Sequence, residues 1–166
     1  MARARFENLE PERQEGILAA AGDEFATHGY AGASLNRIIE NADISKGSLY
    51  YYFDDKADLF ASVVEVAMNR LLKSVEGLSL EDLTAANFWD AVREVGLRSI
   101  DLMREDSWYV RLGMAFPRLR QDPEAVEGVR PMLEWGRRLT TDVLRRGREL
   151  GVVRRDLPLE LLVEVT

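Results

Sequence analysis

The sequence contains no cysteine, a single histidine, five prolines and no apolar segment long enough to cross a membrane. Without cysteine the chain can form no disulfide, thiolate metal site or cysteine nucleophile. A transmembrane helix needs about 20 consecutive apolar residues, and the first ten residues lack the apolar stretch of a secretory signal. These absences favour a cytoplasmic protein with no metal site and no cofactor.

Acidic residues outnumber basic ones, and the net charge of the chain is −7. Residues 1–60 carry 6 lysines and arginines against 11 aspartates and glutamates, and residues 61–166 carry 16 against 18. This balance excludes a diffuse basic surface. Any binding of nucleic acid therefore depends on a few locally arranged cations, hydroxyls and helix N-termini.

Helical periodicity runs along nearly the whole sequence, and strand-like alternation is hard to find, so we predict an all-α protein. Pro11 suits the first turn of a helix, Ser34 and Ser45 suit N-caps, and Gly29 suits a helix end. We expect helices at residues 11–28, 35–41, 46–52, 55–77, 80–104, 106–119, 122–150 and from 157 onward. The last one is still apolar at Thr166, so we expect the whole protein to continue beyond it.

The helices at 35–41 and 46–52 have the layout of a helix-turn-helix, in which the second helix enters the major groove of DNA. The second helix begins with Ser45 and Lys46, where unpaired backbone N–H groups and the helix dipole favour a phosphate. Gly47 lets a base edge or sugar approach the backbone. Ser48 offers a hydroxyl that can donate or accept a hydrogen bond.

Three consecutive tyrosines, Tyr50, Tyr51 and Tyr52, follow in the same helix. Successive residues on a helix point about 100° apart, so the three phenols cannot all be buried and at least one reaches solvent or a phosphate. The alternative is a small helical subdomain with an amphipathic tyrosine patch. The single histidine, His28, precedes Gly29 near a helix C-terminus, where we expect a capping or packing role rather than metal binding or catalysis.

This region resembles the TetR family of bacterial transcriptional repressors. The residues that carry the resemblance are Ala20-Ala21, Phe25 to Tyr30, Ser34, Ile38, Ala42, Ile44 to Phe53, Lys56, Leu59 and Phe60. The segment from Ser45 to Lys56 is far more specific than a bare helix-turn-helix. The chain departs from the family at Asp43, where glycine is usual. Aspartate tolerates the left-handed conformation of such a turn, but it places a negative charge close to DNA.

The resemblance implies a three-helix DNA-binding domain with a helix-turn-helix over residues 1–55 and a larger helical domain for effector binding and dimerisation over residues 56–166. The side chains implied to contact phosphates are Ser34, Tyr50, Tyr51 and Lys56. Those implied to lie near base edges are Lys46, Gly47 and Ser48, with Tyr52 at the margin. The residues implied to hold the two helices together are Leu35, Ile38, Leu49 and Phe53.

Three arginines have open roles in the same domain. Arg37, on the first helix of the motif, could reach the DNA or simply be solvated. Arg3 and Arg5 belong to a terminus that we expect to be disordered, from which they could touch DNA as a loose arm.

The resemblance also implies a homodimer and an unidentified small-molecule effector. The candidate effector contacts are Phe88, Trp89, Met103, Trp108, Tyr109, Arg111, Phe116 and Trp135. Each of these side chains could instead belong to an ordinary core, and Arg93 and Arg111 could pair with an anionic ligand or with Glu94 or Asp101. The candidate dimer contacts are Leu159, Leu161, Leu162 and Val165.

Three functions can be compared with these features of the sequence. The first is a repressor that binds operator DNA as a dimer and is released by an effector. The second is a small-molecule enzyme or carrier, which the sequence supports poorly because it has no nucleophile elbow, P-loop or HExxH motif. The third is a protein-interaction or ligand-binding module of the same shape without operator binding. The sequence best supports the first function, and the acidic N-terminal segment and Asp43 keep the third as its alternative.

Overall fold

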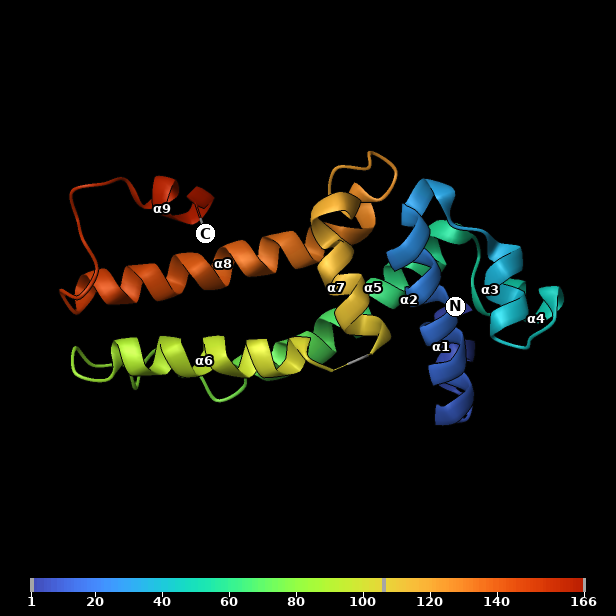
Figure 1. Ribbon diagram of the computed structural model, residues 1–166, viewed down its shortest axis with the longest axis horizontal. Helices are drawn as coiled ribbons and strands as arrows, with labels where there is room; N and C mark the ends of the chain where they lie inside the picture. Colours follow the sequence, from blue (N-terminus) through green and yellow to red (C-terminus); the bar gives the residue numbers. More distant parts are fainter. Residues whose placement is uncertain (1, 106, 166) are drawn as a thin grey trace. The chain divides into compact units, whose positions relative to one another are not determined.

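The computed structural model describes residues 2–105 and 107–165, with the side chains of 2–4, 74 and 163–165 outside the description (Figure 1). The described residues form helices and loops without a strand, which confirms the all-α prediction. The elements are α1 Ala2–Glu7, α2 Pro11–Gly32, α3 Leu35–Asn41, α4 Lys46–Tyr52, α5 Lys56–Leu71, a 3-10 turn Leu72–Val75, α6 Phe88–Met103, α7 Trp108–Leu119, α8 Val126–Glu149 and α9 Leu159–Val165. Among them, no helix has both the length and the hydropathy that a bilayer crossing requires.

The chain divides into two compact units. The first unit combines residues 1–71 with 105–130, and the second combines residues 72–104 with 131–166. Helix α7 therefore belongs to the same unit as the helix-turn-helix. The boundary at residue 55 between a DNA-binding domain and an effector-binding domain was implied by the family resemblance, and it stays a prediction.

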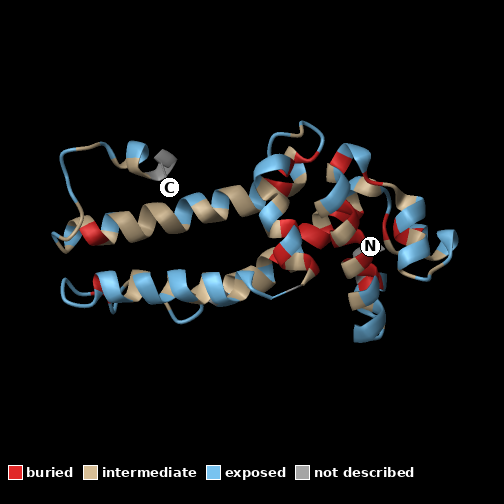
Figure 2. Cartoon of the chain, viewed as in Figure 1, coloured by how far each residue is buried: buried red, intermediate tan, exposed pale blue. Residues whose placement is uncertain are grey.

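The first unit has a continuous core between α2, α5 and α7 (Figure 2). Phe25 and Phe60 are almost fully buried, and their ring centroids lie 4.8 Å apart. Tyr30 adds a third ring, with its centroid 5.1 Å from that of Phe60. Helices α2 and α7 approach closely because Gly22 has no side chain, which leaves room for the indole of Trp108.

The second unit buries much less. Of the described residues, it contributes only Leu83 and Phe88 to the set of buried apolar side chains. The ring of Phe88 fits against Gly147, where a Cβ atom would lie 2.7 Å from Phe88 Cζ. Arg146 ties α8 to the loop before α6, because its Nη2 donates a hydrogen bond to the carbonyl oxygen of Leu83 at 2.8 Å. Hydrogen bonds to this loop thus add to the stability that the small apolar core gives the second unit.

Two helices begin at least four residues after their predicted starts. The helix expected from residue 80 begins at Phe88, because Thr84 and Asn87 form a turn in which each side chain accepts a hydrogen bond from the other's backbone N–H. The helix expected from residue 122 begins at Val126, since Asp122 instead closes a turn with the N–H of Ala125. The expected start at Asp106 lies outside the described residues, and α7 is described from Trp108.

The expectation of a disordered N-terminus was wrong for the described residues, because Ala2–Glu7 form α1. Phe6 is only 5% exposed, and its ring centroid lies 5.0 Å from that of Phe53. The turn between α1 and α2 is held by Gln14, whose Nε2 donates hydrogen bonds to the carbonyl oxygens of Glu7 and Leu9 at 3.0 and 2.7 Å. Burial of one aromatic ring therefore fixes a helix that its polar sequence did not suggest.

Candidate nucleic-acid interface

The two serines predicted as N-caps both act as caps. Ser34 Oγ accepts a hydrogen bond from the N–H of Arg37 at 3.4 Å, and Ser45 Oγ accepts one from the N–H of Ser48 at 3.0 Å. Each bond satisfies a donor that the first turn of a helix leaves unpaired. These caps fix where α3 and α4 begin.

The turn between α3 and α4 passes through the left-handed conformation at Asp43, whose φ is 49°. The sequence prediction that aspartate would accept this backbone is confirmed. The helix pair then closes over a small apolar contact, because Ile38, Leu49 and Phe53 are each 2% exposed or less. Leu35, the fourth residue predicted there, is half-buried.

Helix α4 has one packed side and one exposed side. Leu49 lies on the packed side, which Phe53 continues just after the helix end. Residues 46, 47, 50 and 51 share the other side by helical spacing, and all four are exposed. Tyr50 and Tyr51 are 47% and 54% exposed, whereas Tyr52 is half-buried, so the three phenols divide between surface and packing as predicted.

Lys56, at the start of α5, is held in place. Its Nζ donates a hydrogen bond to the carbonyl oxygen of Ala31 at 3.3 Å and lies 4.8 Å from the ring centroid of Tyr30. Ser34 is half-buried, with its hydroxyl in the cap. For these residues, and for those of α4, contact with DNA stays a prediction that the geometry permits.

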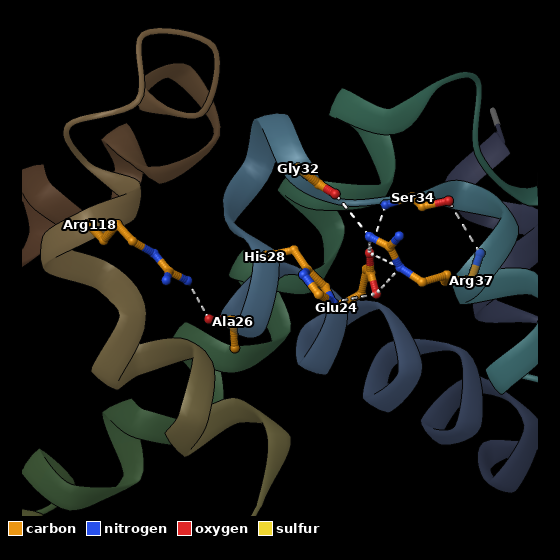
Figure 3. A network of polar contacts seen from close by, with 7 residues as sticks. All are labelled: Glu24, Ala26, His28, Gly32, Ser34, Arg37 and Arg118. Atoms are coloured by element: carbon orange, nitrogen blue, oxygen red, sulfur yellow. Dashed lines mark hydrogen bonds and ion pairs between the residues drawn. The ribbon is translucent and has the colours of Figure 1, made fainter.

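A buried carboxylate joins α2 to the helix-turn-helix (Figure 3). Glu24 is 5% exposed, and its Oε1 accepts hydrogen bonds from the backbone N–H of Ser34 at 2.7 Å and from Nε of Arg37 at 2.9 Å. Arg37 Nη2 also donates to Glu24 Oε1 at 2.5 Å and to the carbonyl oxygen of Gly32 at 2.9 Å. The guanidinium of Arg37 is thus directed into the domain, and its predicted DNA contact would have to coexist with this pairing.

Electrostatics at Glu24 favour its charged form. Burial alone would raise the pKa of the Glu24 carboxyl, but the hydrogen bonds from Arg37 and Ser34 outweigh burial and hold that pKa below its ordinary value. The imidazole Nε2 of His28 lies 3.7 Å from Glu24 Oε2. His28 therefore stands beside this carboxylate, one turn along α2, with its side chain 44% exposed.

Glu24 was not among the predicted residues, although the sequence contains a signal for it. Ile17, Ala21 and Phe25 recur at helical spacing and form a buried stripe of α2. Glu24 lies seven residues after Ile17, so helical spacing places it on the same side of the helix. A charged residue on a buried side requires a partner, and Arg37 is that partner.

The eight predicted effector contacts are divided between the two units. Phe88, Trp89, Met103 and Trp135 belong to the second unit, and Trp108, Tyr109, Arg111 and Phe116 belong to the first. In the second unit Phe88 is buried, Trp89 and Met103 are 58% and 60% exposed, and Trp135 is half-buried. Their role as effector contacts stays a prediction.

Three of the four candidates in the first unit have hydrogen-bond partners within that unit. The indole N–H of Trp108 donates to Glu15 at 2.8 Å, and the hydroxyl of Tyr109 donates to Glu105 at 2.5 Å. Phe116 is half-buried. Arg111 donates two hydrogen bonds to the carboxylate of Asp23, at 2.8 and 2.9 Å, rather than pairing with Glu94 or Asp101.

A cavity of about 690 Å³ lies between α1, α2 and α5 in the first unit. Phe6, Leu18 and Val66 form part of its apolar lining, and none of the eight candidate effector contacts lines it. Among the described residues, no group of three histidines or carboxylates is placed to hold a metal ion.

Known proteins resemble the chain in sequence. The family model described as bacterial regulatory proteins, tetR family, matches residues 17–63, which include α3 and α4. The transcriptional repressor AcnR of Corynebacterium diphtheriae is 31% identical over 164 residues, covering 93% of this chain and 74% of AcnR. The similarity to AcnR therefore extends well beyond the helix-turn-helix.

Solved structures share the fold. The TetR family protein CprB of Streptomyces coelicolor, in complex with its operator sequence, superposes with a TM-score of 0.71 at 24% identity, covering 93% of this chain and 74% of CprB. The regulator FadR of Bacillus subtilis, in complex with stearoyl-CoA, also has a TM-score of 0.71, at 20% identity, covering 90% of this chain and 78% of FadR.

Proposed function

Because the chain belongs to the TetR family of bacterial transcriptional regulators, we propose that it is a repressor that binds operator DNA through α4 and is released by a small molecule. AcnR is named as a transcriptional repressor and FadR as a transcriptional regulator, and CprB was solved in complex with its operator sequence. We assign the DNA-binding domain to residues 1–55 and effector binding and dimerisation to residues 56–166. A cytoplasmic location, with access to the operator, is part of the same proposal.

One observation carries the DNA-binding role. Helix α4 is capped and packed on one side, yet it leaves Lys46, Gly47, Tyr50 and Tyr51 exposed together on the other. At 47% and 54% exposure, the rings of Tyr50 and Tyr51 are accessible to a partner. A cation, two phenols and a glycine that permits close approach suit the backbone and base edges of a major groove.

Dimerisation is supported by the second unit. Its small core and the exposed apolar side chains of α6, among them Leu97 and Ile100, suggest that association completes its burial. We propose the dimer contacts at Leu159, Leu161 and Leu162, of which Leu161 is 50% exposed. The side chain of Val165 lies outside those described. A two-fold dimer places its recognition helices about 34–36 Å apart, on successive major grooves.

The fold and the family are the grounds for proposing that a small-molecule effector exists, and neither identifies its chemistry. FadR was crystallised with stearoyl-CoA, which supports a small-molecule ligand as a class for this fold. Such a ligand releases DNA only if it binds the DNA-free conformation more tightly than the DNA-bound one.

Selection from a randomised DNA pool tests the proposal. We expect the chain to enrich a two-fold symmetric site, and Lys46→Ala and Tyr51→Ala to weaken binding to it without lowering the melting temperature. Glu40→Ala, a change of an exposed residue on α3, serves as a control for general surface effects. Enrichment of no sequence, with residual binding that ignores both variants, would reject operator binding.

A module without operator binding is the second candidate, because residues 1–60 carry five more acids than bases. It predicts DNA binding that is weak, equal for all sequences and nearly independent of salt. The selected site and its salt dependence separate the two candidates.

A further inference from the structure

Helix α1 is docked on the recognition helix by an aromatic contact and presents an arginine beside it. Phe6 packs its ring against Phe53 and against Tyr52, at centroid distances of 5.0 and 6.2 Å. The next residue toward the N-terminus, Arg5, holds its guanidinium carbon 4.6 Å from the ring centroid of Tyr51. Arg5 and Tyr51 are both exposed, so the pair faces solvent on the same side as the proposed DNA contacts.

Cations are scarce in this domain, which makes each exposed one important. Residues 1–60 contain only six lysines and arginines. Arg37 is directed to Glu24, and Lys56 is held by Ala31 and Tyr30. Lys46 is the one basic residue within α4 itself. Since the affinity of DNA for proteins depends strongly on neutralised phosphates, a second cation beside α4 would add substantially to binding.

We propose that Arg5 is a further DNA-backbone contact, held by the Tyr51 ring so that its guanidinium meets the same phosphate as the Tyr51 hydroxyl or the adjacent one. The inference rests on the proposed operator binding. Phe6 is the positioning residue, because its burial fixes α1 against α4 and places Arg5 over Tyr51.

The arrangement favours binding in two ways. A guanidinium can donate two parallel hydrogen bonds to a phosphate while its flat face stays on the aromatic ring. Because α1 is already folded and docked, Arg5 loses less conformational freedom on binding than an arginine on a loose arm would. The contact reads no base, so it contributes equally at every operator sequence.

The test is a fluorescence anisotropy titration of the full chain on its selected DNA site at several salt concentrations. The variants are Arg5→Gln, Arg5→Lys and Phe6→Ala, with Arg13→Gln as the matched control, since Arg13 is an exposed arginine at the start of α2. Circular dichroism melting of each variant reports whether the domain remains folded.

We expect Arg5→Gln to weaken binding and to reduce the slope of log affinity against log salt by about one for each Arg5 that contacts DNA. The wild type should bind more tightly than Arg5→Gln at low salt. This advantage in affinity should decrease about threefold per contact as the salt rises from roughly 50 to 200 mM. Arg5→Lys should restore the slope, and Phe6→Ala should reduce it although no charge is removed. Arg13→Gln should leave both slope and affinity near wild type.

A folded Arg5→Gln variant with wild-type slope on a site that the wild type binds specifically would overturn this inference and leave operator binding standing. An equal loss of slope in Arg13→Gln would also overturn it, because the effect would then be general charge rather than a contact. Absence of specific binding by the wild type would overturn both this inference and the proposed function.

Discussion

The carboxylate of Glu24 helps to hold the start of the helix-turn-helix in place. It connects α2 to the first residues of the motif through the N–H of Ser34 and the guanidinium of Arg37. Since Glu24 is buried, removing its charge leaves these donors without an equivalent partner.

Glu24→Gln is therefore expected to destabilise the chain by about 1–3 kcal/mol at neutral pH, measured by urea unfolding. Glu40→Gln on the exposed surface of α3 is the control and should change little. Unchanged stability of Glu24→Gln would show that water replaces the Glu24 contacts at no cost.

The pH dependence of the Glu24→Gln effect follows from the lowered pKa of Glu24. A lowered pKa in the folded state stabilises the fold above the ordinary value of 4.5, and this contribution is lost as the pH falls through the folded pKa. The difference between wild type and Glu24→Gln should therefore be present at neutral pH and shrink as the pH falls below 4.5. A difference that grows below that pH would contradict the assigned charge state.

Asp43 has a backbone role and an electrostatic cost that can be separated. Its φ of 49° suits asparagine as well as aspartate, so Asp43→Asn should keep the turn while removing one negative charge near the DNA. We expect tighter operator binding by about threefold to tenfold at low salt, with a melting temperature close to wild type. Weaker binding would mean that the Asp43 carboxylate has a favourable role that its position does not suggest.

At the level of elements, the start of α4 serves both folding and binding. Ser45 caps the helix, and its hydroxyl also lies 2.8 Å from that of Ser48. The N-terminus of α4 is also where a phosphate is expected, so the two roles can be tested at one position.

Ser45→Ala should cost about 1 kcal/mol of stability, whereas Ser45→Asp should keep the cap and the stability. The aspartate should nevertheless lower operator affinity more than alanine does, because it repels the phosphate. Denaturant unfolding and operator titration of both variants measure the two effects. Equal operator affinity for wild type and Ser45→Asp would place the phosphate elsewhere.

The contact between α2 and α7 depends on a glycine. A Cβ atom at Gly22 would lie 2.4 Å from Trp108 Cε3, so Gly22→Ala must displace the indole that donates to Glu15. We expect a loss of about 1–3 kcal/mol. Gly16→Ala is the matched control on the same helix, where no atom lies within 4 Å, and it should stabilise by up to about 1 kcal/mol. Similar melting temperatures for the two variants would refute the close packing.

For the whole molecule, local signals were sufficient for the DNA-binding motif. The caps at Ser34 and Ser45, the left-handed turn at Asp43 and the division of the three tyrosines all depend on neighbours within a few residues. Such short-range rules act in the same way in any fold.

Long-range contacts were not predictable in the same way. The pairing of Arg111 with Asp23 joins residues 88 positions apart, and the docking of Phe6 against Phe53 fixed a helix that was expected to be disordered. The start of α6 was misjudged because a reciprocal turn at Thr84 and Asn87 competes with helical periodicity. In each case a tertiary or turn contact outweighed the local pattern.

We propose that this acidic protein binds operator DNA through a few well-placed contacts, and the salt dependence of that binding is the first measurement to make. If Lys46 and Lys56 of two protomers displace counterions from the DNA, and Arg5 adds to them, log affinity for the selected site should fall against log salt with a slope of about −3 to −6. Binding to a shuffled sequence should be much weaker. A slope shallower than about −1, with equal affinity for the selected and shuffled sequences, would exclude operator binding through these contacts.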